Sequence, residues 1–245
     1  MIDIIIPSSG RSSSVLTDID DSVLYVPLDQ KDSYGKYCNN HIETHGKHEF
    51  KNLAEKRQAI YEQYKNVFMV DDDISFVSRL YTEGNNRLNH LSPTESRDLI
   101  YETAENAKDA GTFLFGFGNN PNAKHFHTHN PIVLSSYINA SAFGLLECDK
   151  LFFTNKTTAA ESHWINLLNA YQNRFCWIDK RFCFAQEPNS TFFKPGGQTS
   201  KRTLDTEKAD TIFLYKMFGN CVKLKKNNGD ASIQHEFQRT IKFPF

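Results

Sequence analysis

Short apolar runs alternate with polar stretches along the N-terminal part of the chain. Ile2 to Ile6 and Val23 to Val26 have the length and the β-branched content of buried strands. Phe50 to Tyr64 carries its apolar residues at helical spacing, and Val67 to Val70 is another short apolar run. The order strand, helix, strand predicts a parallel α/β sheet with helices packed on it.

A helix-start signal lies near the middle of the chain. Ser92 is a candidate N-cap, Pro93 suits the first helical position, and Glu95 occupies the capping-box position. This helix is predicted to run to about Ala110 and to stop at Gly111. Three further elements are predicted: a short strand at Phe113–Phe117, strand segments within Ile132–Leu146, and a helix from about Glu161 to Tyr171.

Three adjacent carboxylates, Asp71, Asp72 and Asp73, directly follow the run that ends at Val70. If the strand continued through them, Asp71 and Asp73 would share one face, and two anions on one face favour a bound cation. Oxygen ligands favour Mg²⁺ or Mn²⁺, and Mg²⁺ commonly shares its coordination shell with substrate phosphates. The pattern therefore predicts a divalent-cation site and a phosphate-bearing substrate. The alternative is an acidic turn that caps a helix starting at Ile74.

Length and composition indicate one domain. The chain has 245 residues, 39% of them hydrophobic, which is enough for a sizeable core, and its formal net charge of −1 gives no global attraction to nucleic acid or anionic membrane. Its five cysteines lack CxxC spacing, as is typical of reduced thiols. Because no signal-peptide pattern and no apolar segment of membrane-spanning length is present, we expect a soluble, cytoplasmic protein without a membrane partner.

Four segments in consecutive order resemble the GT-A family of nucleotide-sugar glycosyltransferases. They are residues 4–11 (IIIPSSGR), 55–58 (EKRQ), 69–73 (MVDDD) and 160–164 (AESHW). The resemblance implies an α/β, GT-A (Rossmann-like) fold with a mixed, mostly parallel sheet flanked by helices. It implies a single domain over 1–245, with a nucleotide-binding half at 1–110 and an acceptor-binding half at 111–245.

The resemblance also assigns residues to a donor site. Asp71 or Asp72 would contact the nucleoside ribose, while Asp73, with Asp71, would bind Mn²⁺ or Mg²⁺ between the donor phosphates. The other implied donor-binding residues are Pro7, Ser8 and Arg11 after the first strand, Arg57 on the helix before the Asp cluster, and Lys201 and Arg202 in a loop over the diphosphate. A surface ion pair is an equally good interpretation of Arg57. A plain surface turn is an equally good interpretation of the loop at 194–202.

Glu161 matches the position at which inverting family members keep an acidic general base. Such a base takes the proton from the acceptor hydroxyl as its oxygen attacks the anomeric carbon. The family usually has Glu-Asp there, whereas this chain has Ala160-Glu161, and an ordinary carboxylate at a helix N-terminus is the alternative. His235 would be a third metal ligand by the same resemblance, or else a surface histidine.

Three further features are most similar to the TET/JBP-associated glycosyltransferases of phages and eukaryotes. They are the Pro-Ser-Ser-Gly-Arg opening, the Lys-Arg pair before the Asp strand, and Gly196-Gly197 followed by Arg202. The likeness extends to phage DNA arabinosyltransferases. It implies a nucleoside diphosphate sugar donor, foremost a UDP-sugar, a hydroxymethylated pyrimidine in DNA as acceptor, and the host cytoplasm as location if the protein is phage-encoded.

Other motifs change this interpretation little. His125, His127 and His129 alternate, so on a strand they would share a face and could bind zinc, but the Asn-rich surroundings from Asn119 to Asn130 favour a loop. The chain has neither a P-loop nor a GxSxG elbow. The alternatives are a transferase for a glycan, lipid or protein acceptor, a nucleotidyltransferase, which the single glycine of the first loop disfavours, and a non-catalytic nucleotide-sugar binding module.

Overall fold

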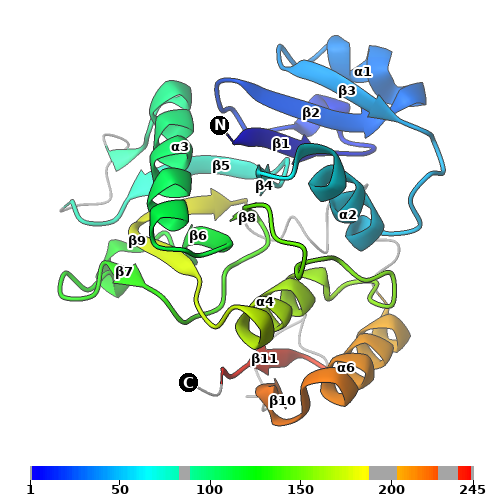
Figure 1. The fold of residues 1–245 in the computed structure, drawn as a ribbon. Helices are drawn as coiled ribbons and strands as arrows, with labels where there is room; N and C mark the ends of the chain where they lie inside the picture. The colour runs from blue at the N-terminus through cyan, green and yellow to red at the C-terminus, as the bar shows by residue number, and fades with distance from the viewer. Residues whose placement is uncertain (1, 83–88, 188–202, 226–236, 244–245) are drawn as a thin grey trace.

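The computed structural model describes residues 2–82, 89–187, 203–225 and 237–243. Within them, nine strands form one sheet in the order β3-β2-β1-β4-β8-β6-β9-β5, and β7 pairs with β9 (Figure 1). The strands are β1 (Asp3–Pro7), β2 (Ser22–Pro27), β3 (His41–His45), β4 (Val67–Val70), β5 (Ile74–Arg79), β6 (Leu114–Gly118), β7 (Ile132–Val133), β8 (Ala142–Leu145) and β9 (Trp177–Gln186).

Most strands of this sheet run in the same direction. β1, β2, β3, β4, β6 and β9 are mutually parallel, and β5, β7 and β8 run against them. The predicted α/β class with a mixed, mostly parallel sheet is therefore confirmed. The order β3-β2-β1-β4 is that of the first half of a Rossmann-type sheet, in which the strand order reverses between β1 and β4. Ligands of open α/β sheets bind at the carboxyl ends of the strands at such a reversal.

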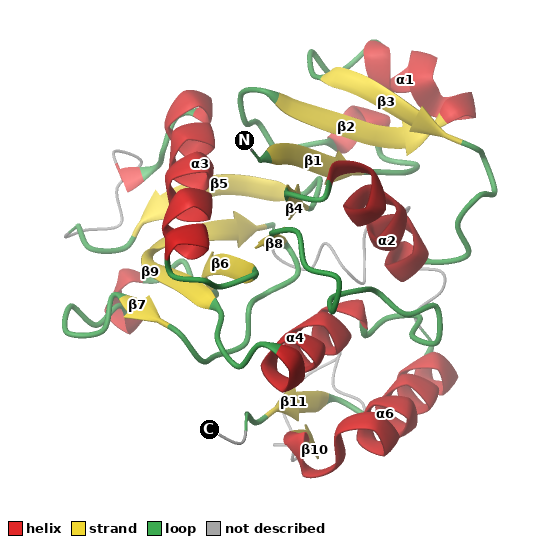
Figure 2. Cartoon of the chain, in the orientation of Figure 1, coloured by secondary structure: helices red, strands yellow, loops and turns green. Residues whose placement is uncertain are grey.

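Helices cover both faces of the sheet (Figure 2). α1 and α3 contribute to the core on one face, whereas α2, α4 and α6 contribute to the core on the other. Side chains alternate along β1, so Ile4 and Ile6 join the core that contains α1 and α3, whereas Ile5 joins the core that contains α2, α4 and α6. The helices are α1 (Lys31–Gly35), α2 (Leu53–Tyr64), α3 (Pro93–Asp109), α4 (Glu161–Gln172) and α6 (Leu204–Phe218).

Local capping signals set the starts of two of these helices, and one of them, α3, starts as the sequence predicts. The Ser92 side chain accepts from the Glu95 amide and Glu95 accepts from the Ser92 amide, which completes the predicted capping box of α3. Gly111 has φ +69°, a conformation that favours glycine, two residues after α3 ends. α2 starts at Leu53 rather than Phe50, because the Asn52 side chain accepts from the Glu55 amide and caps the helix there.

The alternative of a helix starting at Ile74 is wrong, because Ile74 opens strand β5. β5 pairs with β9 near the end of the sheet, and the sequence analysis predicts neither of them. Both strands mix apolar and polar residues without strict alternation, and β9 contains the run Asp179-Lys180-Arg181. β3 and α6 are likewise absent from the sequence prediction. Their place in the fold comes from tertiary packing rather than from a strong local pattern.

The C-terminal residues add a small second sheet. β10 (Val222–Leu224) and β11 (Arg239–Ile241) pair antiparallel, and α6 packs against β10 and α4. The Trp164 ring of α4 stacks on Phe213 of α6 with a centroid distance of 5.6 Å. Arg239 of β11 forms a buried ion pair with Glu207 of α6 at 2.8 Å. These contacts fix α6 beside the N-terminal end of α4.

A close approach between β6 and β8 requires a glycine at position 144. Phe115 lies opposite Gly144, and a Cβ atom there would lie 2.0 Å from two atoms of the Phe115 ring. Because this ring is fully buried, Gly144→Ala is expected to lower the free energy of unfolding by about 1–3 kcal/mol. Denaturant unfolding measures the change. Gly35→Ala, which meets no atom within 4 Å, is the control, and equal stability of the two variants would contradict the prediction.

Candidate functional site

A pocket of about 450 Å³ opens at the carboxyl ends of β1 and β4, where the strand order reverses. Residues after β1 and β4, at the start of β8, and in the first turns of α2 and α4 line it. Ligand pockets commonly have volumes of about 300–1,000 Å³, so this one suits a small-molecule ligand. Eight of the residues that the sequence analysis singles out line it: Pro7, Ser8, Arg11, Arg57, Asp71, Asp72, Asp73 and Glu161.

The loop after β1 is tied to the Asp cluster. The Ser8 hydroxyl lies 2.6 Å from the Tyr34 hydroxyl and donates a hydrogen bond to Asp72. Arg11 Nη1 lies 3.0 Å from Asp72 Oδ1 and 3.4 Å from Asp73 Oδ2. The Arg11 side chain is 10% exposed, and its Nε atom has no hydrogen-bond partner among the described residues. One guanidinium therefore bridges two carboxylates and offsets one of their two negative charges.

The three aspartates do not alternate as strand residues would. β4 ends at Val70, and residues 71–73 form a turn before β5. Asp72 and Asp73 consequently both contact Arg11, whereas Asp71 pairs with Arg57, so the prediction that Asp71 and Asp73 share a face apart from Asp72 is wrong. Asp71 is the most accessible of the three, with 27% of its side chain exposed.

Arg57 links the Asp cluster to the start of α4. Its Nη2 donates to Asp71 Oδ1 at 3.0 Å and to the Ala140 carbonyl at 2.9 Å, and its Nη1 donates to Glu161 Oε1 at 3.3 Å. The side chain is 1% exposed, so the alternative of a surface ion pair is wrong. Burial raises the pKa of Asp71 to about 7, although the neighbouring Arg57 acts in the opposite direction. Arg57 therefore opposes the effect of burial on Asp71 and joins Asp71 to Glu161.

Glu161 is the first residue of α4, as the sequence predicts. It lines the pocket and is 9% exposed. The helix N-terminus and the ion pair with Arg57 both favour a carboxylate at this position. An ionised carboxylate beside a pocket is the form that accepts a proton, and its role as a general base stays a prediction.

Lys56 is a pocket residue to which the sequence analysis assigns no role. Its Nζ donates to the Ser8 carbonyl at 2.9 Å and lies 5.6 Å from the centroid of the Tyr25 ring. Among the described residues, no carboxylate lies within ion-pair distance of this ammonium group. Burial lowers the pKa of Lys56 to about 7, and the negative charge of Asp72 opposes that shift. Lys56 is a buried cation with unused donors beside the pocket.

The pocket offers oxygen ligands for a divalent cation, but not a closed site. No three His, Cys, Asp or Glu side chains gather around one point in the described ranges. Asp73 accepts from Gln186 at 2.9 Å as well as from Arg11, so a cation there must compete with both donors. Mg²⁺ commonly uses one or two carboxylates and completes its shell with substrate phosphates and water. Asp71 and Asp73 pair with different arginines, and their role as ligands of one metal ion stays a prediction.

The structure describes only some of the remaining predicted residues. Lys201, Arg202 and the rest of the loop at 194–202, and His235, lie outside the described residues. His125, His127 and His129 lie in a loop that contains a short 3-10 helix (Ala123–His125), so the strand geometry that would place them on one face does not form. The loop predicted from Asn119 to Asn130 is confirmed.

The described fold and pocket define a mixed α/β protein with a ligand-sized site at the carboxyl edge of its sheet. No protein-family model matches the chain, and no curated protein matches it. Among solved structures, the crystal structure of A197 from STIV matches 74% of this chain and 83% of its own chain, with 10% sequence identity and a TM-score of 0.38. Similarity at this level assigns neither a family nor an activity.

Every helix in the described ranges is too short or too polar to cross a membrane.

Proposed function

We propose that the protein is a metal-dependent glycosyltransferase that moves a sugar from a nucleoside diphosphate donor to a hydroxyl acceptor. The observation that carries this proposal is the convergence of eight predicted site residues, from four separate segments, on one pocket of about 450 Å³. The pocket lies at the strand-order reversal between β1 and β4, where nucleotide ligands of open α/β sheets bind. The resemblance to GT-A enzymes supplies the reaction class.

The pocket is suited to a donor of high negative charge. Arg11 and Lys56 line the pocket near the end of β1, where the Lys56 ammonium uses one donor on the Ser8 carbonyl. Arginine and lysine bind phosphates through charge-assisted hydrogen bonds. Pro7 and Ser8, at the end of β1, would line the nucleoside. Asp71 or Asp72 would contact the ribose hydroxyls.

Asp71 and Asp73 would hold Mn²⁺ or Mg²⁺ in this proposal. Such an ion supplies Lewis-acid stabilisation of the negative charge on the departing diphosphate. Arg11 lies beside these carboxylates, where it pairs with Asp72 and Asp73. Arg57 is a positioning residue, since it contacts Asp71 and Glu161 together.

Glu161 would act as the general base. It lies on the α4 side of the pocket, opposite the loop after β1, and accepts a hydrogen bond from Arg57. In an inverting transfer this carboxylate would take the proton of the acceptor hydroxyl while the acceptor oxygen bonds to the anomeric carbon. The bond from that carbon to the diphosphate oxygen breaks, and the electron pair leaves with the diphosphate. The acceptor we propose, on the resemblance, is a hydroxymethylated pyrimidine in DNA.

Calorimetric titration tests the donor site. We expect the protein to bind UDP or another nucleoside diphosphate in the presence of Mn²⁺, and Asp73→Asn to weaken that binding at least about tenfold by removing one charged ligand. Asp98→Asn is the matched control, because Asp98 is an exposed aspartate of α3. Absence of binding to any nucleoside diphosphate, with and without Mn²⁺, would reject the proposed function. Binding that Asp73→Asn leaves unchanged would reject the metal assignment.

A further inference from the structure

The two halves of the chain differ sharply in charge. Residues 1–110 contain 12 Lys and Arg against 19 Asp and Glu, a formal charge of −7, whereas residues 111–245 contain 16 against 10, a formal charge of +6. The overall charge of −1 conceals this difference. Such asymmetry between halves of a chain is typical of proteins that bind a polyanion through one of them.

The structure increases the basic character of the surface in the second half. Four of its acidic side chains are buried: Glu161, Asp179, Glu207 and Asp210. Glu207 pairs with Arg239, and Asp210 accepts hydrogen bonds from the backbone amides of Thr158 and Ala159. These acids serve internal contacts, whereas most of the lysines of this half lie at the surface.

α6 presents a basic and aromatic face. Lys208, Ile212, Tyr215 and Lys216 follow one another at helical spacing and are all exposed, Tyr215 by 54%. On the opposite side of the helix, Leu214 is buried in the core between α6 and α4. Two further lysines are exposed beside α6: Lys223 on strand β10, and Lys225 directly after that strand.

We propose that this exposed face of α6, together with the lysines at β10, binds the sugar-phosphate backbone of nucleic acid. The inference rests on the proposed function, for which it identifies the surface that holds acceptor DNA. Asp210 of α6 caps the segment that leads into Glu161, so the helix is fixed directly to the pocket side of α4. Lysines contact phosphates, and an exposed tyrosine can stack on an unpaired base.

A lipid surface is the less suitable partner. An interfacial helix needs a continuous apolar face that enters the membrane. The apolar face of α6 is already covered, because Leu214 is fully buried and Phe213 stacks on Trp164. The exposed side of α6 carries Lys208 and Lys216 together with Ile212, Tyr215 and Met217, a mixture that suits a charged backbone with intermittent contacts.

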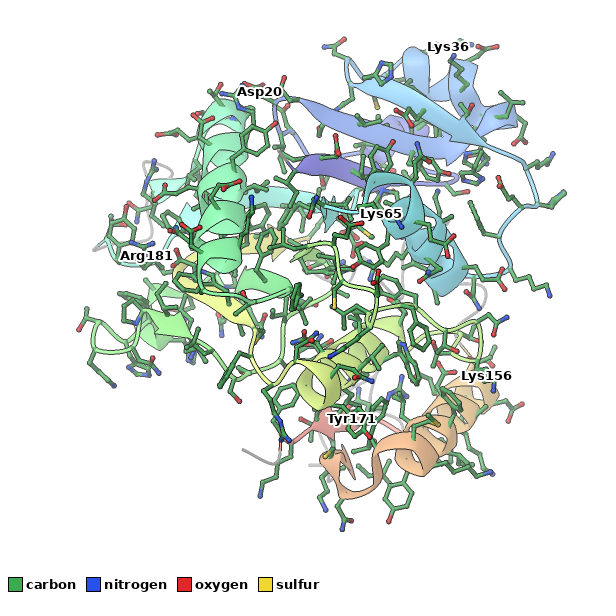
Figure 3. All side chains as sticks on the ribbon, in the orientation of Figure 1. Asp20, Lys36, Lys65, Lys156, Tyr171 and Arg181 are labelled. Atoms are coloured by element: carbon green, nitrogen blue, oxygen red, sulfur yellow. The ribbon has the colours of Figure 1, made fainter. Side chains whose placement is uncertain are left out.

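The test is fluorescence anisotropy with a labelled DNA duplex between about 50 and 200 mM salt. The variant Lys208→Gln/Lys216→Gln is expected to weaken binding several-fold at low salt and to reduce the slope of log K against log salt by about 2, since each lost phosphate contact contributes about 0.9. The control is Lys31→Gln/Lys36→Gln, which removes two exposed charges from α1. Figure 3 places Lys36 at the far end of the molecule from α6.

Three results would overturn the proposal. They are no duplex binding by the unaltered protein at low salt, an equal loss in the α6 and α1 variants, and binding to phosphatidylserine vesicles without binding to DNA. Titration with UDP and Mn²⁺ on the same samples separates this proposal from the proposed function. Intact nucleotide binding without duplex binding rejects the α6 surface alone, whereas duplex binding without nucleotide binding supports the surface and rejects the transferase.

Discussion

Arg57→Met is expected to lower the free energy of unfolding by about 3–5 kcal/mol, the usual effect of removing one member of a buried ion pair. For a domain of this length that corresponds to a decrease in Tm of roughly 6–20 °C. The guanidinium contacts Asp71, Glu161 and the Ala140 carbonyl, and its side chain is 1% exposed. Methionine fills much of the volume but leaves the carboxylates of Asp71 and Glu161 without their cation. Thermal and denaturant unfolding measure the loss.

The effect of Arg57→Met should depend on pH. Burial holds the pKa of Asp71 near 7 in the folded protein, against an ordinary value of 3.8. The folded state therefore binds the proton first, and Asp71 contributes stability that falls as the pH rises from about 4 to about 7. Without Arg57 the pKa of Asp71 rises further, so the decline in the stability that Asp71 contributes extends to higher pH. We expect Arg57→Met to be less destabilising at about pH 5 than at about pH 8.

A matched control separates burial from charge pairing. Arg97 on α3 also contacts two carboxylates, Asp21 and Asp98, but at the surface. Exposed ion pairs contribute little, so Arg97→Met should leave Tm nearly unchanged. Arg57→Lys should lower Tm by an intermediate amount, because one ammonium group cannot replace a planar guanidinium that contacts two carboxylates. Equal Tm values for Arg57→Met and Arg97→Met would contradict the buried-bridge interpretation.

The elements with strong local signals could be predicted from the sequence. β1 and β4 are short β-branched or apolar runs, and the α3 capping box of Ser92 and Glu95 is encoded in four consecutive residues. β9 could not be predicted, because it combines a buried Ile178 with the polar run that follows it and pairs with three other strands on its two edges. Such a strand is specified by its neighbours rather than by its own pattern.

The candidate site was predictable as far as its residues follow strand ends and helix starts. Asp71 to Asp73 follow β4, Ser8 and Arg11 follow β1, and Glu161 opens α4, so topology brings them to one edge. The resemblance also places Arg57 in this site, but it predicts neither the contacts of Arg57 with Asp71 and Glu161 nor a role for Lys56. Arg57 and Lys56 are adjacent on a helix that looks solvent-exposed by sequence, yet both are buried because this part of α2 faces the pocket. One signal in the sequence could have indicated this burial. A basic pair lies beside the apolar positions of a helix that precedes an acidic strand end.

Lys56 should make anion binding dependent on pH. Burial lowers its pKa to about 7, so its ammonium form is lost as the pH rises above 7, while the unfolded chain keeps the proton to about pH 10. A ligand that binds only the protonated lysine loses apparent affinity in proportion to the protonated fraction. In EDTA, binding of inorganic pyrophosphate to the unaltered protein is therefore expected to weaken by up to about tenfold per pH unit between about pH 7 and pH 9. Calorimetric titration measures it.

Substitutions of Lys56 identify the titrating group. Lys56→Arg carries a charge that persists through this range, so its pyrophosphate affinity should stay nearly constant with pH, whereas Lys56→Met should bind weakly at every pH. Asp71 also titrates near pH 7, and its added negative charge would weaken anion binding in the same direction. An unchanged slope in Lys56→Arg would therefore assign the dependence to Asp71. A pyrophosphate affinity of Lys56→Arg that does not change with pH would show that the ammonium group next to the Ser8 carbonyl is the anion-binding group of the pocket.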